Sequence, residues 1–381
     1  MTKGREKGLV FVTPDYHCSF IYRDHLRRLG WRADIFVPAE YPRVLLFEEP
    51  DIQGMDLRTK NFWELAAAAL RMQLLYFRLI RRYKFHVYYG TLETFTILER
   101  VPGMGFLLRR SFRLNLSLAR IAGVKIIYIP SGAPDEELPA IIAELGNAQE
   151  GLSVRDTDEM RVHFRLLNRY SNLCVGIGTL DSSQYSATHL KYKVIDLFRW
   201  RPDLEIPEQY QLEKFEGIRI LHSFMFGSER TALQGGNIKG SKYVSEAVER
   251  LRSEGYRVEF LSFDGIPSRD YRYLQSQVDI VVDQLIRGNW GSTAIEAIAL
   301  GKPVVTFVRR EWESFYYSLF PETRPLPFVN ADRWTIYSHL KDLLDNPDQI
   351  DRIGRESRKW AELHLNPMLN VSAFISAIES I

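Results

Sequence analysis

A glycine-rich turn between two apolar runs holds the residues best suited to chemistry. The runs 278–282 (VDIVV) and 303–308 (PVVTFV) are rich in β-branched residues, as expected for parallel strands covered on both faces. Between them, residues 288–293 (GNWGST) supply flexible backbone and then a Ser/Thr start for an apolar helix over 294–300. The free N–H groups and the positive dipole end of such a helix attract phosphate. The segment therefore predicts a phosphate-binding turn.

An acidic residue follows the turn. Glu296 lies one turn inside the expected helix, where its carboxylate can accept hydrogen bonds from the sugar hydroxyls of a bound nucleotide. Gly301 and Pro303 end that helix, as these residue types commonly do. An ordinary β-α-β unit with a solvated Glu296 has the same local pattern. The turn by itself leaves both interpretations open.

Apolar strands and amphipathic helices alternate along most of the chain. A strand followed by a helix, repeated, predicts an α/β fold with parallel, doubly wound sheets and helices on both faces. A chain of 381 residues can hold two such domains. We expect domains at 1–200 and 217–362, a charged, proline-bearing linker at 201–216, and a C-terminal helix within 363–381. The expected strands cover 8–13, 31–37, 85–89, 124–129, 172–177, 218–221, 256–262, 278–282 and 303–308, and the expected helices cover 19–29, 62–83, 107–122, 155–170, 241–254, 270–277, 294–300, 333–344, 347–362 and 369–381.

Composition and charge narrow the class of protein. Lys plus Arg number 50 and Asp plus Glu 48, a net charge of +2, so nucleic acid is not expected as a partner. Cys18 and Cys174 are the two cysteines, too few for a disulfide framework and without metal-ligand spacing, which favours a reducing cytoplasm. The apolar run near the N-terminus, about five residues, is too short for a signal peptide, and no stretch approaches the ~18 apolar residues of a membrane span. We expect a cytoplasmic protein that would meet a membrane only from its surface.

The second half of the sequence resembles the retaining GT-B glycosyltransferases of the glycosyl transferases group 1 family. The resemblance rests on 237–241 (NIKGS) before a helix, the strand YRVEFLSF at 256–263, and above all the block AIEAIALGKPV at 294–304. It spans about residues 217–310, and the first half matches mainly in its α/β rhythm. The resemblance implies two Rossmann-like domains that face a cleft, the first binding the acceptor and the second a nucleotide-diphosphate sugar. It also allows the final helix to cross back to the first domain.

The resemblance assigns roles to the residues of the turn. In that family the acidic residue matching Glu296 holds the ribose hydroxyls, backbone N–H groups matching 291–293 hold the diphosphate, and a lysine matching Lys239 supplies a cation. Such fixed donors stabilise the charge that builds on a leaving diphosphate and can replace a metal ion, so no metal or cofactor is expected. His222 is added because it ends a predicted strand and so faces the expected cleft. The predicted donor-binding residues are Lys239, Arg230, His222, Asn289, Gly291, Ser292, Thr293 and Glu296.

Two positions depart from the family pattern. The family usually has a second acidic residue eight positions before the ribose-binding one, where this chain has Gly288; Asp283 lies five residues too early. The family also often has an arginine shortly before the Lys-Gly pair, where this chain has Gly235 and Gly236, and Arg230 in the preceding loop is the candidate replacement. We therefore expect altered contacts to the donor sugar, or a loss of activity.

Two loops at strand ends of the first domain carry the candidate catalytic residues. Asp15 and His17 follow the first strand, where the family often has a glycine-rich loop, and Asp135 follows a later strand. Ser131 stands where many family members have a histidine, so no general base can be carried over from the family. In retaining members the departing phosphate can take the proton of the acceptor. We predict that Asp15, His17 and Asp135 contact acceptor or donor; polar residues in solvated loops are the alternative.

Two segments combine arginines with large apolar side chains. Residues 71–84 and 103–125 each contain five basic residues and no acidic ones. Helices of this kind can lie on an anionic membrane surface, which would place the protein at the inner membrane face. The alternative is that their apolar faces pack on the sheet and their arginines are merely solvated.

The sequence as a whole predicts a cytoplasmic GT-B glycosyltransferase of the hexosyltransferase type that acts with retention. It would move a sugar from a nucleotide-diphosphate donor, such as a UDP-sugar, to a hydroxyl of a glycan, lipid-linked or small-molecule acceptor, as in polysaccharide biosynthesis. Gly288 and Ser131 favour a second function, that of a non-catalytic nucleotide-sugar-binding protein or complex subunit. A sugar-nucleotide epimerase is a third, although its usual paired carboxylates are not evident in the sequence.

Overall fold

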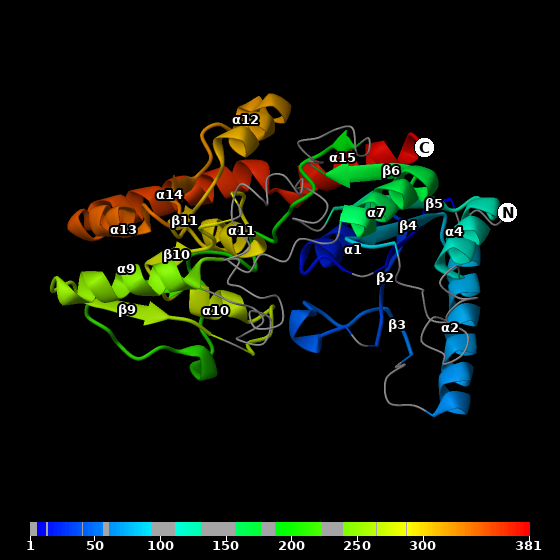
Figure 1. Ribbon diagram of the computed structural model, residues 1–381, viewed down its shortest axis with the longest axis horizontal. Helices are drawn as coiled ribbons and strands as arrows, with labels where there is room; N and C mark the ends of the chain where they lie inside the picture. Colours follow the sequence, from blue (N-terminus) through cyan, green and yellow to red (C-terminus); the bar gives the residue numbers. More distant parts are fainter. Residues whose placement is uncertain are drawn as a thin grey trace. The chain divides into compact units, whose positions relative to one another are not determined.

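A computed structural model shows two α/β units, each built around a parallel sheet (Figure 1). It describes residues 6–12, 14–39, 41–55, 61–92, 111–130, 157–176, 187–222, 239–263, 265–286 and 288–381. The described residues of 6–130, 157–194 and 367–381 form the first unit, and those of 195–366 form the second. The last segment of the chain thus returns to the unit in which the chain begins.

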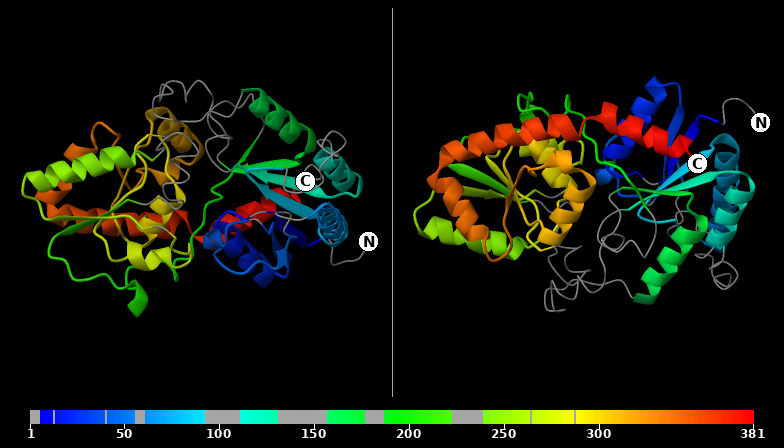
Figure 2. Two further views of the ribbon diagram at one scale, coloured as in Figure 1. Left: turned by 60° about the horizontal axis from the view of Figure 1, so that its bottom comes forward. Right: turned by 90° about the horizontal axis from the view of Figure 1, so that it is seen from above.

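The described residues of the first unit contain a seven-stranded sheet in the order β3-β2-β1-β4-β5-β6-β7. All neighbouring strands are parallel. All five residues of the central strand β1 are buried, because helices cover both faces of the sheet (Figure 2). The strands are β1 (Gly8–Val12), β2 (Arg32–Val37), β3 (Ile52–Gln53), β4 (Phe85–Tyr89), β5 (Lys125–Ile129), β6 (Leu173–Gly176) and β7 (Thr188–His189). The helices are α1 (Cys18–Arg28), α2 (Phe62–Arg82), α4 (Ser111–Ile121), α7 (Thr157–Tyr170) and α15 (Pro367–Glu379), with a 3-10 turn η1 (Arg43–Leu45).

The helices of the first unit divide between the two faces of its sheet. Buried residues of α2, α4 and α7 form one apolar cluster with the central strands. On the other face α15 packs on α1, where the Phe374 ring stands edge-on to Tyr22 with centroids 5.1 Å apart. Asn370 of α15 also donates to the carbonyl of Lys193 at 3.0 Å. The final helix therefore completes the core of the first unit.

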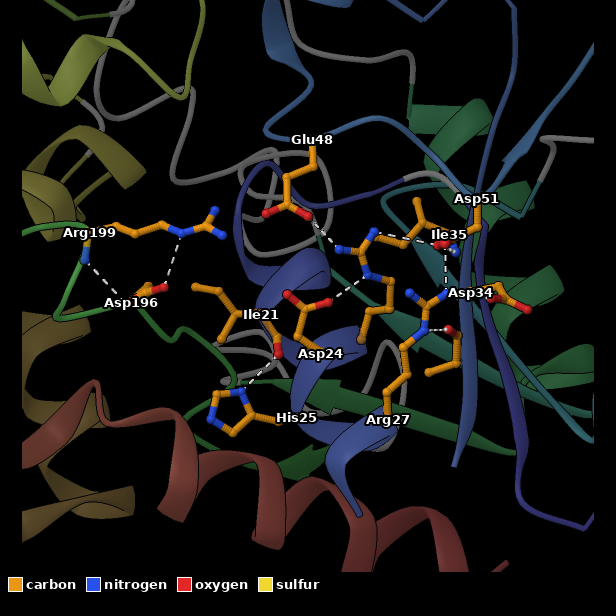
Figure 3. A network of polar contacts seen from close by, with 12 residues as sticks. Ile21, Asp24, His25, Arg27, Asp34, Ile35, Glu48, Asp51, Asp196 and Arg199 are labelled. Carbon is orange, nitrogen blue, oxygen red and sulfur yellow. Dashed lines mark hydrogen bonds and ion pairs between the residues drawn. The ribbon is translucent and has the colours of Figure 1, made fainter. Parts of the chain in front are cut away.

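Ion pairs tie α1 to the segment around β3 (Figure 3). The Arg23 guanidinium is buried and contacts three carboxylates: Asp24 at 2.8 Å, Asp51 at 3.5 Å, and Glu48. Arg27, one turn further along α1, lies 2.6 Å from Asp51. Because three carboxylates surround Arg23, its cation is what holds them together.

The second unit has a smaller sheet in the order β12-β11-β10-β8-β9, again with all neighbouring strands parallel. α9 and α13 pack on one face of it, and α10 and α11 lie on the other, where α14 packs against α11. The strands are β8 (Ile218–His222), β9 (Val258–Leu261), β10 (Ile280–Val282), β11 (Val304–Thr306) and β12 (Phe328–Asn330). The helices are α9 (Ser241–Ser253), α10 (Tyr271–Gln275), α11 (Ser292–Ala299), α12 (Arg310–Leu319), α13 (Ile336–Asp345) and α14 (Pro347–His364), with 3-10 turns η4 (Glu208–Tyr210) and η5 (Pro321–Thr323).

The predicted fold class, two doubly wound parallel α/β domains with a helical C-terminal tail, is confirmed. The sequence reading missed α12 and the edge strands β3, β7 and β12, because strands of two or three residues carry no readable alternation. The helix expected at 294–300 begins two residues earlier, at Ser292. Within the described residues, no helix has the length and apolarity needed to cross a membrane.

Candidate functional site

Polar groups gather at the carboxyl edge of the second sheet. β8 ends at His222, and Asp283 directly follows β10. Because the strands are parallel, these ends share one edge of the sheet, which is where open α/β sheets bind ligands. α9 and α11 both begin at this edge, since each follows a strand that ends there. Two helix N-termini therefore point their free N–H groups toward this region.

A buried carboxylate organises the start of α11. Asp283 is fully buried, and its Oδ1 accepts a hydrogen bond from Lys239 Nζ at 3.0 Å. Its Oδ2 accepts the backbone N–H of Gly291 at 2.6 Å. Lys239 Nζ also donates to Thr293 Oγ1 at 3.5 Å. The structure thus brings together Lys239, Gly291 and Thr293, three of the predicted donor-binding residues, around an aspartate that the sequence had set aside.

The turn that carries Lys239 is held by His222. Gly240, which follows Lys239, has a φ of +80°, and a Cβ there would lie 3.1 Å from Leu285 Cβ, so the turn requires glycine. The buried His222 ring contacts the carbonyl of Val282 through Nδ1 at 2.9 Å and Ser241 Oγ through Nε2 at 2.6 Å. A carbonyl can only accept, so Nδ1 carries the proton and donates it. His222 therefore helps to fix the start of α9, which directly follows Lys239 and Gly240.

The His222 ring is neutral near pH 7. Burial in the protein and the nearby Lys239 cation lower the pKa of His222 to about 4. Nε2 of the neutral ring then carries no proton, and the Ser241 hydroxyl donates to it. With both ring nitrogens bonded inside the protein, His222 acts on the site through the turn that it holds.

α11 is fixed at both of its ends. Its N-cap, Gly291, is held by Asp283, whereas the described residues make no hydrogen bond to the backbone N–H groups of 292–294. At the other end Arg358 of α14 donates to the carbonyl of Ala299 at 2.5 Å, and a cation there also complements the helix dipole. The open N–H groups therefore belong to a helix that cannot easily shift.

Glu296 shares a face of α11 with Ser292 and Thr293. It follows Ser292 by four residues and Thr293 by three, and side chains at these spacings share one face of a helix. Glu296 is 3% exposed, so its side chain is almost fully shielded from solvent. Asn289 lies in the turn before α11, where its Oδ1 accepts from Gln284 Nε2 at 3.0 Å. The predicted ribose and phosphate contacts are therefore close neighbours.

Gly288 has no room for a side chain. Its φ is +80°, and a Cβ built on it would lie 2.1 Å from Cγ of Arg309. The Arg309 backbone N–H also donates to the Gly288 carbonyl at 2.9 Å. An arginine stem thus fills the space that a side chain at this position would need.

Aromatic rings also pack against the turn that precedes α11. The Trp290 ring stacks on Trp312 with centroids 5.9 Å apart and stands edge-on to Tyr316 at 5.0 Å. Trp312 and Tyr316 belong to α12, the helix that the sequence reading missed. The turn between β10 and α11 is therefore anchored by packing as well as by Asp283.

In the first unit, the loop after β1 carries two of the predicted residues. Asp15 is buried, and its Oδ2 accepts from Lys193 Nζ at 2.7 Å. Its other oxygen, Oδ1, accepts no hydrogen bond from the described residues. Between Asp15 and His17, Tyr16 has a φ of +38°, an unusual backbone conformation for a residue other than glycine. His17 is buried beside Phe47, with ring centroids 6.4 Å apart.

Lys193 was not anticipated from the sequence. Its side chain is 34% exposed, and its Nζ lies 5.5 Å from the centroid of the Tyr89 ring at the end of β4. Burial acts to lower the pKa of the Lys193 ammonium, but the Asp15 carboxylate outweighs it and raises that pKa above its ordinary value. The loop after β1 therefore holds a fixed ion pair with a partly exposed cation.

Three of the residues discussed from the sequence, Arg230, Ser131 and Asp135, lie outside the described residues. Among the residues that are described, no group of three or more His, Cys, Asp or Glu side chains could hold a metal ion. Asp283 could have been found from the sequence, because a charged residue directly after a buried strand must find a partner. Lys193 could not, since it lies far from Asp15 in the chain and belongs to no motif.

Comparison with known proteins gives structural but no sequence relatives. No protein-family model matches the sequence, and no curated protein matches it. The structure is similar to sucrose-phosphate synthase from Thermosynechococcus elongatus, with a TM-score of 0.56 and 12% identity over 98% of both chains. It is also similar to HepE from Anabaena, solved in complex with UDP-glucose, with a TM-score of 0.53 and 13% identity over 98% of this chain and 100% of that one.

These likenesses extend over whole chains, so they include both units and their order. At 12% and 13% identity they concern the fold. Two parallel-sheet α/β domains followed by C-terminal helices are the architecture that these proteins share with this one. The chain therefore has the GT-B fold.

Proposed function

We propose that this protein is a glycosyltransferase that moves a sugar from a nucleotide-diphosphate donor to an acceptor hydroxyl. The observation that carries the proposal is the open N-terminus of α11 at the carboxyl edge of the second sheet, with Lys239 and Thr293 beside it. HepE, which is similar in fold, was solved with UDP-glucose, and we propose a donor of that class for this chain.

The diphosphate would lie against the first turn of α11. The N–H groups of 292–294 are oriented donors, and the helix dipole adds a positive field at this end. Lys239 lies beside this turn, 3.5 Å from Thr293 Oγ1, but Asp283 neutralises much of its charge at 3.0 Å. A diphosphate carries two or more negative charges, so we expect a further cation to contribute, and Arg230 is our candidate.

The nucleoside would continue along the same face of α11. Glu296 would accept hydrogen bonds from the ribose hydroxyls, because it lies one turn beyond the N–H groups that hold the phosphates. Asn289 lies in the turn that leads into this helix and would contact the donor from there. We assign His222 a positioning role, since both of its ring nitrogens are bonded within the protein.

Fixed donors of this kind suit a dissociating diphosphate. In the transfer, the bond between the anomeric carbon and the diphosphate oxygen breaks, and its electron pair stays on that oxygen. The acceptor oxygen bonds to the anomeric carbon and gives its proton to the departing diphosphate, which corresponds to transfer with retention. Charge on the leaving oxygen grows toward the transition state, so donors held in place beforehand lower the barrier.

The acceptor would be bound by the first unit, through the loop after β1 and the segment that contains Asp135. Asp15 has one oxygen without a hydrogen bond from the described residues, so it can accept one from an acceptor hydroxyl. Its other oxygen is held by Lys193, which fixes the orientation of the carboxylate. We therefore propose that Asp15 positions the acceptor, as would His17 and Asp135, for a glycan, lipid-linked or small-molecule hydroxyl.

A thermal-shift panel of UDP-, GDP- and ADP-sugars tests the donor site. A ligand at about 100 times its dissociation constant adds roughly 2.7 kcal/mol of stability. Glu296→Ala should remove most of the shift that the best donor gives, whereas Glu246→Ala, on the exposed side of α9, should leave it intact. If Glu296→Ala keeps the full shift, the ribose does not lie where we place it.

One observation favours a second function, binding without transfer. The Arg309 stem fills the space beside Gly288, where the family that the sequence resembles usually has a second carboxylate, so this chain would lack that contact to the donor sugar. The donor identified by thermal shift should be incubated with and without acceptors. Binding with neither transfer nor slow donor hydrolysis would favour a non-catalytic nucleotide-sugar-binding subunit, and conversion of the donor sugar without acceptor would favour an epimerase.

A further inference from the structure

The outer side of α2 carries an apolar stripe that the core of the first unit does not use. The buried side of this helix faces the sheet through residues such as Leu65, Met72 and Tyr76. On the opposite side, exposed apolar residues recur at intervals of four and three: Trp63, Ala67, Leu70, Leu74 and Phe77. We call these five residues the outer stripe. At 100° per residue they fall within one narrow face of the helix, opposite the buried one.

The outer stripe is strongly exposed. Trp63 is 78% exposed, Leu70 62% and Leu74 50%. α2 lies at the periphery of the first unit, with its outer side turned away from the sheet (Figure 1). The stripe runs from Trp63 to Phe77 of α2, about 21 Å at 1.5 Å per residue, so it covers a long and narrow surface. Contiguous exposed apolar surface of this kind commonly marks an interaction site.

The exposed residues next to the outer stripe are mainly arginines. Arg71, Arg78 and Arg81 are exposed, and within the described part of the chain none of them forms an ion pair. Arg71 and Arg78 flank the stripe on one side, and Arg81 continues it at its C-terminal end. The one acidic residue of α2 is Glu64 in its first turn, so the field along the rest of the helix is positive.

We propose that the outer stripe of α2 docks the protein on an anionic lipid bilayer. Leu70, Leu74 and Phe77 would enter the boundary between head groups and acyl chains, and Trp63 would lie at the same level near one end of the helix. The arginines would contact lipid phosphates. A second copy of the chain is the competing occupant, because the spacing also suits a helix pair. Charge argues against it, since a second copy would bring the same arginines against these.

The structure also corrects the sequence-based expectation for this segment. Tyr76, Leu79 and Ile80 of the basic stretch 71–84 are buried against the sheet, as the alternative interpretation had it. The surface that remains exposed begins earlier in the chain, at Trp63, and includes only part of that stretch. The second basic stretch, 103–125, lies partly outside the described residues. The proposal thus rests on α2 and does not depend on the glycosyltransferase activity.

Vesicle flotation of the full chain tests the proposal. The probes are vesicles of phosphatidylcholine alone and of phosphatidylcholine mixed with phosphatidylglycerol, each at low and high salt. We expect binding to the anionic vesicles that weakens with salt and little binding to the neutral ones. Arg71→Gln, Arg78→Gln and Arg81→Gln together should lower the partition coefficient on the order of 100-fold, at roughly fivefold per arginine.

A matched pair of variants separates the stripe from general apolar exposure. Leu70→Ser with Leu74→Ser should lower partitioning by roughly tenfold or more. Leu363→Ser with Leu369→Ser, at leucines that are 66% and 64% exposed on α14 and α15, should leave it unchanged. Neither pair alters a buried residue, so unchanged melting curves are expected for both.

Three results would overturn the proposal. The first is a wild-type chain that fails to bind anionic vesicles at low salt. The second is a Leu70/Leu74 variant that binds as well as the wild type. The third is a lipid-free wild-type chain that sediments as a dimer and becomes monomeric with the Leu70/Leu74 changes, which would assign the stripe to a second copy of the chain.

Discussion

Replacing His222 by asparagine should make the stability of the protein less sensitive to acid. Burial and the Lys239 cation lower the pKa of His222 from 6.5 to about 4 in the folded protein. In the unfolded chain the ring takes up a proton near pH 6.5, whereas in the folded protein it does not until about pH 4. Stability that is present above about pH 6.5 is therefore lost as the pH falls toward about 4.

The size of this loss follows from the shift in the His222 pKa. A shift from 6.5 to about 4 is worth about 3 kcal/mol when fully expressed, at about 1.36 kcal/mol per unit. Between about pH 7 and about pH 4.5 the wild type should lose about 2 kcal/mol through this residue alone. His222→Asn cannot titrate, so its free energy of unfolding should fall by that much less over the same range.

Urea unfolding at a series of pH values, followed by tryptophan fluorescence, measures the difference between the two proteins. Other groups titrate in both, so the quantity of interest is the wild-type value minus the variant value at each pH. Ser241→Ala is the control: it removes the hydrogen bond to Nε2, costs about 1 kcal/mol at every pH, and leaves the histidine in place. Parallel pH curves for the wild type and His222→Asn would refute the reasoning.

Two further predictions concern buried ion pairs. Asp283→Asn should lower the free energy of unfolding of the second unit by about 3 kcal/mol, because Lys239 then loses its counter-ion. A double-mutant cycle with Lys239→Met, measured by urea unfolding, should show a coupling energy of about 1 kcal/mol or more. Additive losses would contradict the pairing. Arg23→Met should destabilise the first unit by about 2 kcal/mol, because Asp24 and Glu48 lose the cation that they contact, while Asp51 keeps Arg27. A change below about 0.5 kcal/mol in urea unfolding would mean that the network is dispensable.

The sequence was sufficient for the architecture because the signals are local and repeated. Each central strand is a short apolar run, and each connecting helix carries a buried face, so the alternation is readable without any contact. α12 was missed although its Trp312 and Tyr316 are buried. Aromatic residues surround them in the sequence, so apolar and polar residues do not separate into two clear helix faces. Its role is visible only where Trp290 packs on it.

The candidate site was predictable only in the part that lies on one segment. Gly291, Thr293 and Glu296 follow one another along the turn and α11, so spacing alone places them together. The pairing of Lys239 with Asp283 joins residues 44 positions apart, and that of Lys193 with Asp15 joins residues 178 apart. Contacts of this kind depend on the register of the strands, which the sequence pattern does not specify.

Gly288, where the sequence departs from the family pattern, packs against Arg309. The two residues must therefore be considered together. A left-handed φ of +80° costs a residue with a Cβ about 1–2 kcal/mol, and the Arg309 stem occupies the space that the Cβ would need. A carboxylate at this position would therefore require both another backbone conformation and a different place for Arg309. Because the two features are interlocked, Gly288 is part of a consistent local packing in which the flanking side chain is a cation. The turn before α11 thus combines open backbone N–H groups with a flanking arginine.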